Sequence, residues 1–264
     1  MLHALVLAFA MAEVGPLSIM TFNIWGDYFG NPPEERDLKE AGVILRWKPD
    51  IVAFQEVTPN FWKSRLFPEL EKNGYGIVRG DEPDAIRRAG GKGTEGYVNH
   101  VPLAYRRDRL EREASGYEIF HLKLTDNKGV TWAVLKDRTD GRRLIAFSTH
   151  FWYQANGCES DTIRELNAKH CIDLFARIKA LFGNLPVIGG GDLNCKEDGM
   201  PALVAFERAG YSDAGKCADA FSTVPSEHTD PVRGADGRYR GEKGIVGKQG
   251  HSMLDRVYYS GGIH

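Results

Sequence analysis

Five polar side chains stand at or just beyond the ends of apolar segments, where enzymes commonly present reactive groups from a rigid scaffold. They are Asn23, Glu56, His150, Asp192 and Asn194. A carboxylate that directly follows the runs VAFQ or PVIGGG would be costly to bury without a partner. A shared hard cation removes that cost, because Mg²⁺ favours oxygen ligands and keeps several waters. The set therefore predicts a divalent-metal site.

Each of these residues also has a structural interpretation when it is taken singly. Asn23 could be a turn residue, Glu56 a helix cap and His150 a hydrogen-bonded core histidine. For one such residue alone the structural interpretation is favoured. The occurrence of all five in this order shifts the balance towards a catalytic site.

The segments that must position these residues alternate between strand and helix patterns without a repeat. We expect strands at 16–25, 50–57, 75–80, 101–107, 117–124, 129–138, 142–151, 185–194 and 253–260. Helices are expected at 34–47, at 61–73 with an interruption at Pro68, around Ile163 to Leu181 with Asp161 as a candidate cap, and at 201–210. Two packed sheets with outer helix layers would bury all of these faces. One domain over residues 16–264 is the prediction.

Composition and charge limit the possible partners. The chain of 264 residues is 42% apolar and has a formal net charge of −2. It therefore has no net positive charge that would attract nucleic acid or an anionic membrane. Its four cysteines show no CxxC spacing, which argues against a structural zinc site and leaves both free thiols and disulfides open.

The first twelve residues, MLHALVLAFAMA, form an apolar run with a small-residue end. This run predicts a signal peptide and a secreted or periplasmic protein, the alternatives being an N-terminal extension and a cytoplasmic protein. No other stretch approaches the roughly 18 apolar residues of a membrane span, so no stable membrane insertion is expected.

Five short motifs carry a resemblance to a known family. TFNIW, PDIVAFQEV, STHF, GGDLN and LDRVYYS, in this order, resemble the endonuclease/exonuclease/phosphatase superfamily, whose fold is deoxyribonuclease-I-like. The motifs are short individually, but the ordered set spans about residues 17 to 260. The resemblance implies an α/β (α+β) fold, a four-layer α-β-β-α sandwich of two mixed or antiparallel sheets flanked by helices.

The resemblance also implies roles for the site residues. Glu56 would bind Mg²⁺ or Mn²⁺, with Asn23 beside it at the metal or the phosphate. Asp192 would deprotonate the attacking water, Asn194 would hold that water or a phosphoryl oxygen, and His150 would hydrogen-bond the phosphate. Such roles suit an in-line displacement in which a metal neutralises the oxygens. Two further substrate-binding residues are implied by position, Tyr97 and Asn99.

One motif of the superfamily is not found. Asp255 of LDRVYYS would orient a histidine from a later Ser-Asp-His motif, and the chain as given reaches His264 without it. Two explanations stay open: a C-terminally truncated copy, which we favour because Asp255 is present, and a degenerate member.

The predicted function is metal-dependent hydrolysis of a phosphoester by a monomer, as a phosphodiesterase or nuclease. The alternatives are a phosphomonoesterase on lipid, sugar or nucleotide phosphates and an impaired binding member. The segment 232–250 is locally basic and could line a phosphodiester groove, although a solvated loop is favoured. Trp132 and the cluster Phe151 to Tyr153 could stack a base or a sugar, and core packing explains them equally well.

Overall fold

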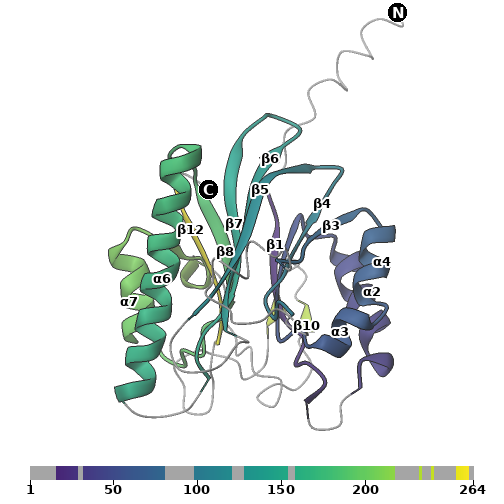
Figure 1. Ribbon diagram of the computed structural model, residues 1–264, viewed down its shortest axis with the longest axis horizontal. Coiled ribbons are helices and arrows are strands. Elements are labelled where there is room, and N and C mark those ends of the chain that lie inside the picture. The colour runs from purple at the N-terminus through teal and green to yellow at the C-terminus, as the bar shows by residue number, and fades with distance from the viewer. Residues whose placement is uncertain are drawn as a thin grey trace, which may run out of the picture.

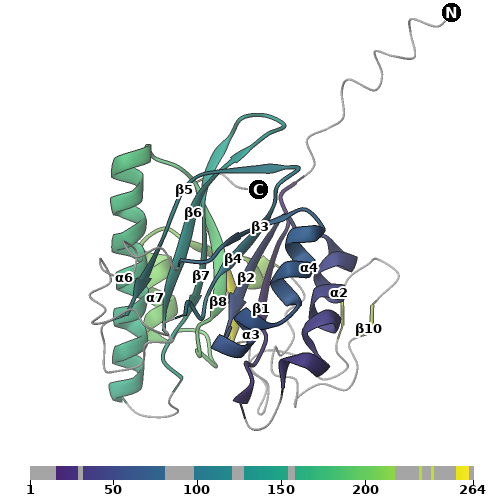
Figure 2. The same cartoon turned by 45° about the vertical axis from the view of Figure 1, so that its right-hand side comes forward.

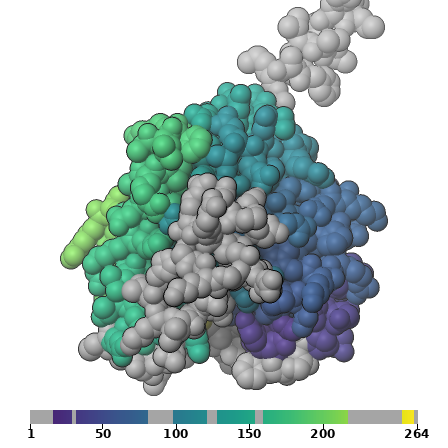
Figure 3. Space-filling model, in the orientation of Figure 1, coloured from purple at the N-terminus to yellow at the C-terminus, as the bar shows by residue number. Residues whose placement is uncertain are grey.

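Two β-sheets pack face to face, and helices cover the outer face of each sheet (Figure 1). This computed structural model describes residues 16–28, 32–80, 98–120, 128–153, 158–217, 232–233, 239–240 and 254–261. The four-layer sandwich that the sequence predicts is confirmed. Figure 3 shows the N-terminal elements, in blue, on one side and the helices of the second half, in green, on the other.

The first sheet has the strand order β1-β2-β4-β3. β1 and β2 run parallel, whereas β4 is antiparallel to both β2 and β3. The strand bounds are Ile19–Asn23 for β1, Ile51–Gln55 for β2, Tyr75–Val78 for β3 and Leu103–Arg106 for β4.

The second sheet has the order β5-β6-β7-β8-β12-β9. It also contains one parallel pair, β7 with β8, and its other pairs are antiparallel. Its strands are β5 (Leu110–Ile119), β6 (Gly129–Asp137), β7 (Arg143–His150), β8 (Val187–Asp192), β9 (Ser212–Asp213) and β12 (Asp255–Ser260). A separate two-residue pair joins β10 (Val232–Arg233) to β11 (Tyr239–Arg240).

Helices lie on the outside of each sheet (Figure 2). The first sheet is covered by α2 (Asp37–Trp47), α3 (Pro59–Lys63) and α4 (Leu66–Lys72), and the second by α6 (Cys158–Phe182) and α7 (Pro201–Arg208). Short 3-10 turns are η2 (Pro33–Glu35) and η3 (Ala214–Cys217). The described helices include none that is both long and apolar enough to cross a membrane.

Strand alternation explains the layers. In β2, Val52 and Phe54 pack in the core beneath the helices, while Ile51 and Ala53 face the second sheet. In β7 the same alternation sends Phe147 towards α6 and Ala146 towards the first sheet. Successive side chains of a strand point to opposite faces, so each central strand supplies two cores at once.

Some local predictions differ from the structure. The break in the segment 61–73 comes at Ser64, and Pro68 lies inside the first turn of α4, where a missing N–H costs nothing. β5 begins at Leu110, earlier than expected, because its exposed polar residues hide the strand pattern. α6 begins at Cys158, so Asp161 lies in its first turn and is not the cap.

The glycines that precede Asp192 let the neighbouring strands approach β8. A Cβ atom on Gly190 would lie 2.0 Å from the carbonyl oxygen of Arg256, and one on Gly191 would lie 1.8 Å from that of Thr149. Neither position tolerates a side chain. The Gly-Gly-Gly run therefore brings β7 and β12 close to the residue that ends β8.

Candidate active site

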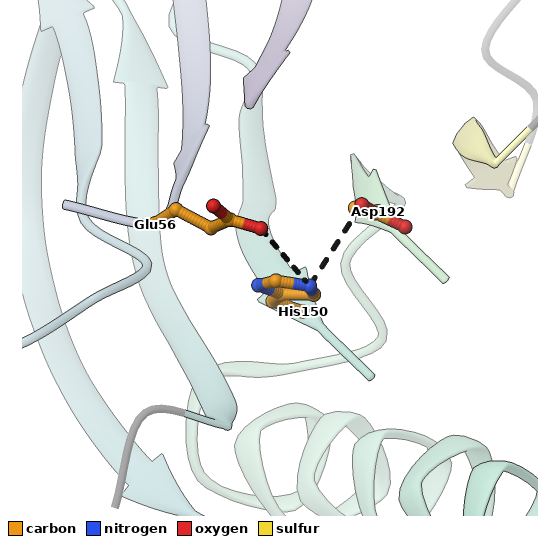
Figure 4. A group of neighbouring side chains, drawn as sticks. All are labelled: Glu56, His150 and Asp192. Carbon is orange, nitrogen blue, oxygen red and sulfur yellow. Dashed lines mark ion pairs between the residues drawn. The ribbon is translucent and has the colours of Figure 1, made fainter. Parts of the chain in front are cut away.

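The four central site residues come from the ends of the two parallel pairs. Asn23 ends β1 and Glu56 follows β2, while His150 ends β7 and Asp192 ends β8. In the second sheet, His150 and Asp192 are register partners. Because the strands of a parallel pair end at the same edge and the sheets are stacked, all four side chains meet at one end of the sandwich. Figure 4 shows Glu56 and Asp192 directed towards the imidazole of His150.

One amide connects the two carboxylates. The Nδ2 group of Asn23 donates to Oε1 of Glu56 at 3.1 Å and to Oδ2 of Asp192 at 3.0 Å. Nε2 of His150 lies 3.9 Å from the same Glu56 oxygen and 3.8 Å from the same Asp192 oxygen. Atoms of Glu56, His150 and Asp192 thus all lie within 4.8 Å of one another.

Burial disfavours the charges of this cluster. It raises the pKa of Asp192, and it raises the pKa of Glu56, to which the nearby Asp192 adds a like-charge repulsion. Burial also holds the pKa of His150 well below its usual value, and the neighbouring Lys128 lowers it further. The imidazole is therefore neutral at physiological pH.

Lys128 is a site residue that the sequence analysis missed. Its buried ammonium group donates from Nζ to Nε2 of His150 at 2.6 Å. Burial lowers its pKa to about 8, against the opposing attraction of Asp192 and Glu56. In the sequence, Asp-Asn-Lys-Gly is typical of a turn and does not indicate this contact. The strand register produces it, because Lys128 directly precedes Gly129, the register partner of His150.

His100 is the second residue that the sequence did not reveal. Burial, together with the charge of Lys128, lowers the pKa of His100 to about 4. His100 also lowers the pKa of His150. The two imidazoles and the Lys128 ammonium group therefore influence one another electrostatically. Because both histidines are neutral, Lys128 carries the positive charge among these three residues.

Two residues of the site adopt a left-handed backbone. Glu56 has φ 62° and Asn194 has φ 52°. This conformation is uncommon for residues other than glycine, and least expected for a long side chain such as glutamate. Flanking hydrogen bonds of 3.1 Å hold the Glu56 turn, from Ile24 N–H to the Gln55 carbonyl and from Val57 N–H to the His100 carbonyl. Such imposed conformations cluster at functional sites.

Asn194 orients the carboxylate beside it. Its backbone N–H donates to Oδ1 of Asp192 at 2.9 Å, and its own amide donates to the carbonyl of Phe151 at 3.1 Å. The backbone of Phe151 in turn donates to the Asp192 carbonyl at 3.0 Å. The loops after β7 and β8 are thereby joined, and Oδ2 of Asp192 is left facing Asn23 and His150.

The other predicted site residues are placed differently. Asp255 begins β12 as the register partner of Asp192, at the site end of the sheet. Asn99 is 1% exposed. Its amide donates to Thr131 Oγ1 at 2.7 Å and accepts from Val101 N–H at 2.8 Å. This placement favours a structural role for Asn99, and its contact with substrate stays a prediction. Tyr97 lies outside the described residues.

The donor set suits a hard divalent cation. Half-buried Glu56 and buried Asp192 share one amide, and burial disfavours their negative charges, which a cation would compensate. Nε2 of His150 already accepts from Lys128, so the available donors are oxygens of Glu56 and Asp192 and the amide oxygen of Asn23. Oxygen ligands are those that Mg²⁺ and Mn²⁺ prefer.

Comparison with known proteins agrees with this geometry. The model of the endonuclease/exonuclease/phosphatase family matches residues 20–264. A search of the curated proteins finds no match. Among solved structures, the chain is similar to the human Nocturnin catalytic domain with a bound sulfate anion, at 18% identity and a TM-score of 0.63, over 93% of this chain and 83% of that one.

Two further solved structures have the same fold. A mannosyl-6-phosphatase from Bacteroides thetaiotaomicron matches at 16% identity and a TM-score of 0.61, over 93% of this chain and 86% of that one. TDP2 from D. rerio, complexed with a single-strand DNA product, matches at 16% identity and a TM-score of 0.58, over 92% and 83%. At such identities the likeness establishes the fold and leaves the substrate open.

Proposed function

The chain belongs to the endonuclease/exonuclease/phosphatase family, and on that premise we propose that it hydrolyses a phosphoester bond with a divalent cation, Mg²⁺ or Mn²⁺, as a phosphodiesterase or nuclease. The observation that carries the proposal is the pair of carboxylates, half-buried Glu56 and buried Asp192, bridged by the Asn23 amide beside a buried lysine. Burial raises the pKa of both carboxyl groups even with Lys128 nearby, and a bound cation would compensate their negative charge.

Glu56 and Asn23 would hold the cation, with Asp192 at its other side. When bound, the cation supplies a positive charge that polarises a phosphoryl oxygen. Asp192 would accept the proton of the attacking water as a general base. Asn194 keeps the Asp192 carboxylate in place through its backbone N–H. These residue roles are part of the proposal.

Lys128 would neutralise phosphate charge from the other side, and His150 would position the lysine there. The neutral imidazole accepts a hydrogen bond from the ammonium group and so holds it at the site. A buried ammonium group is preorganised towards charge that develops on phosphoryl oxygens, and little solvent screens it. Asp255, at the same edge of the sheet, would orient a histidine if a longer chain supplied one.

The runner-up function is phosphomonoester hydrolysis. The similar structure from Bacteroides thetaiotaomicron is a mannosyl-6-phosphatase, and the same donor set serves either bond. The third candidate is a member that binds metal or ligand and does not turn it over. A net charge of −2 disfavours tight binding to long nucleic acid, which needs several phosphate contacts.

Two chromogenic substrates separate these functions. Bis(p-nitrophenyl) phosphate reports diester hydrolysis, and p-nitrophenyl phosphate reports monoester hydrolysis. We expect the diester to be hydrolysed with Mg²⁺ and not with EDTA, and the activity to disappear in Asp192→Asn. Preference for the monoester would favour the runner-up. Cation binding by calorimetry without turnover of either ester would favour the binding member and overturn the hydrolase.

We also propose that the protein acts outside the cytoplasm, on the basis of the N-terminal apolar run alone. Residues 1–12 lie outside the described residues. N-terminal sequencing of the mature protein would test this, since a start after Ala12 is expected and retention of Met1 would contradict it.

A further inference from the structure

The loop that leaves the site after β1 has a backbone conformation that tryptophan does not favour. Trp25 and Gly26 are both left-handed, with φ 54° and 44°. A bulky residue rarely adopts this conformation, and the Trp25 side chain gains little burial from it, since it is 55% exposed. Such a conformation persists only where surrounding contacts impose it. Other parts of the fold must therefore hold this loop in place.

Arg36 makes the contacts that hold the loop. Its guanidinium group donates from Nη1 to the carbonyl oxygen of Ile24 at 2.8 Å and from Nη2 to that of Gly26. These two carbonyl groups belong to the residues on either side of Trp25. The planar fork of an arginine suits two acceptors at once. One side chain thus fixes both ends of the left-handed segment.

The helix layer determines where the guanidinium group of Arg36 lies. Arg36 directly precedes α2, and its carbonyl oxygen accepts from the N–H of Glu40 at 2.9 Å. Oε1 of Glu40 lies 3.2 Å from Nη1 of Arg36. The guanidinium carbon also lies 5.1 Å from the ring centroid of Phe61, a buried residue of α3. The loop beside the site is therefore tied to the helices that cover the first sheet.

A single peptide unit connects Arg36 to Asn23. The carbonyl of Ile24 and the N–H of Trp25 belong to this unit, and because a peptide unit is planar, fixing its oxygen also fixes the direction of its N–H. Arg36 binds the oxygen, and the N–H donates to Oδ1 of Asn23 at 2.9 Å. That bond leaves Nδ2 of the same amide directed at the two carboxylates of the site.

We propose that Arg36 is a positioning residue, which fixes the Asn23 amide through this peptide unit and thereby aligns the two carboxylates for a cation. This rests on the proposed function, because the cation site is part of it. Arg36 acts through another residue, so its loss should resemble the loss of an outer-shell partner, which lowers metal affinity or activity about ten- to hundredfold.

Calorimetric titration with Mn²⁺ tests this without turnover. We expect Arg36→Met to weaken Mn²⁺ binding about tenfold, and Asn23→Ala to weaken it at least as much. Because both changes disturb the same amide, the double variant should bind Mn²⁺ within about twofold of Asn23→Ala alone. Losses that multiply in the double variant would mean that Arg36 does not act through Asn23.

Two further variants separate positioning from stability. Arg65 makes an ion pair in the same helix layer, with Nη2 2.8 Å from Oδ1 of Asp37. Arg65→Met should therefore lower the thermal midpoint and leave Mn²⁺ affinity unchanged. Arg36→Lys keeps a cation beside Glu40 but lacks the fork, so it should restore the midpoint more fully than the affinity. Should Arg36→Met fail to fold, Arg36→Lys replaces it in the double variant.

The outcomes separate this proposal from the proposed function. Unchanged Mn²⁺ affinity in Arg36→Met, multiplying losses, or an equal loss in Arg65→Met would overturn the positioning role. Hydrolysis of bis(p-nitrophenyl) phosphate that depends on Mg²⁺ and on Asp192 would still support the hydrolase. Non-multiplying losses in a protein that hydrolyses no ester would support positioning and count against the hydrolase. A wild type that binds no Mn²⁺ would overturn the positioning role together with the cation site.

Discussion

Two clusters of charged side chains lie at opposite ends of the same two sheets, and their charges are compensated differently. At one end, Asp50 precedes β2 and Asp137 ends β6. Asp50 accepts hydrogen bonds from the backbone and hydroxyl of Ser18, each at 2.8 Å, and from Arg106 at 3.3 Å. Arg109 lies between the two aspartates, 3.4 Å from each. At the other end, Glu56 and Asp192 share the amide of Asn23.

The pKa values follow from these partners. Burial alone would raise the pKa of Asp137, but hydrogen bonds from Thr139 and the charge of Arg109 lower it below its usual value. At the site end, burial prevails and the pKa values of Glu56 and Asp192 are raised. The aspartates at the Asp50 end meet arginines, whereas the carboxyl pKa values at the Glu56 end stay raised despite Lys128, as is common where a site takes a ligand. We therefore expect a structural role for the Asp50 end and place the proposed binding site at the Glu56 end.

The largest effect should come from Glu56→Gln, which removes a charge at the site end. We expect hydrolysis of bis(p-nitrophenyl) phosphate to fall by roughly three orders of magnitude, because residues of one catalytic unit do not act independently. The thermal midpoint without metal should be unchanged or higher, because the removed charge repelled Asp192. A lower midpoint would contradict our comparison of the two ends.

Asp50→Ala should have the opposite effect. Its removal takes one acceptor from each of Ser18, Arg106 and Arg109, and we expect the free energy of unfolding in urea to fall by about 3 kcal/mol. Activity per folded molecule, measured well below the midpoint, should stay near that of wild type. Asp50→Asn is the control, since it keeps an acceptor and should lose less. A large loss of activity with normal stability would place Asp50 at a functional site.

Lys128→Met tests the only cation that the described residues place against His150. We expect kcat to fall by about a hundredfold, as when a preorganised group that stabilises transition-state charge is removed. Stability should hold, because methionine fills the buried space and the lysine lost solvation there. Unchanged kcat in Lys128→Met would remove Lys128 from the proposed mechanism.

Metal binding should stabilise the folded protein through the Glu56 end and not through the Asp50 end. At a Mg²⁺ concentration ten times Kd, binding to the folded state adds about 1.4 kcal/mol to the free energy of unfolding. The midpoint shift should appear in wild type and in Asp50→Asn, and be absent in Glu56→Gln. Scanning calorimetry measures these shifts. An equal shift in all three proteins would mean that the cation binds elsewhere.

The smallest effect concerns pH in metal-free protein. A carboxyl group with a raised folded pKa binds more protons folded than unfolded, so its contribution is present below the unfolded pKa and lost as pH rises through the folded one. The raised pKa values of Glu56 and Asp192 therefore make the free energy of unfolding decline as the pH rises above about 4.5, whereas the lowered pKa values of His100 and His150 make it rise over the same range. Since the histidines act equally in both proteins, the slope of the unfolding free energy against pH, below the Lys128 pKa of about 8, should be more positive in Asp192→Asn than in wild type.

Glu40 has a pKa that burial raises to about 7, so it contributes a decline of the same sign, equally in both proteins. Asp137 acts in the opposite direction. Its lowered pKa gives stability that is present above the unfolded value of 3.8 and is lost as the pH falls. Identical slopes for wild type and Asp192→Asn in urea titrations with EDTA would argue against a raised Asp192 pKa.

Most of the architecture could be predicted from the sequence because periodicity is a local property. The apolar alternation of β2 and β7, the helical spacing before Leu174 and the glycines before Asp192 each identify an element without knowledge of its neighbours. The order of the motifs then indicated the family. The start of β5 was predicted too late, because the first half of this strand is exposed and polar.

Which of the polar residues share the site depended on packing. Asn99 and Lys128 both look like loop residues in the sequence, yet Asn99 is used in internal hydrogen bonds and Lys128 contacts His150. That contact depends on the β6–β7 register, which joins residues more than twenty positions apart. No local pattern specifies such a pairing.

The sequence by itself determined the elements, their order and the chemical types at their ends, because side-chain periodicity and residue chemistry are properties of short segments. The tertiary structure alone decided which charges are compensated. Asp50 and Glu56 are six positions apart on the two ends of one strand, yet one meets arginines and the other an amide. Burial and partners come from the stacking of two sheets, and they make one carboxylate structural and the other available to a metal.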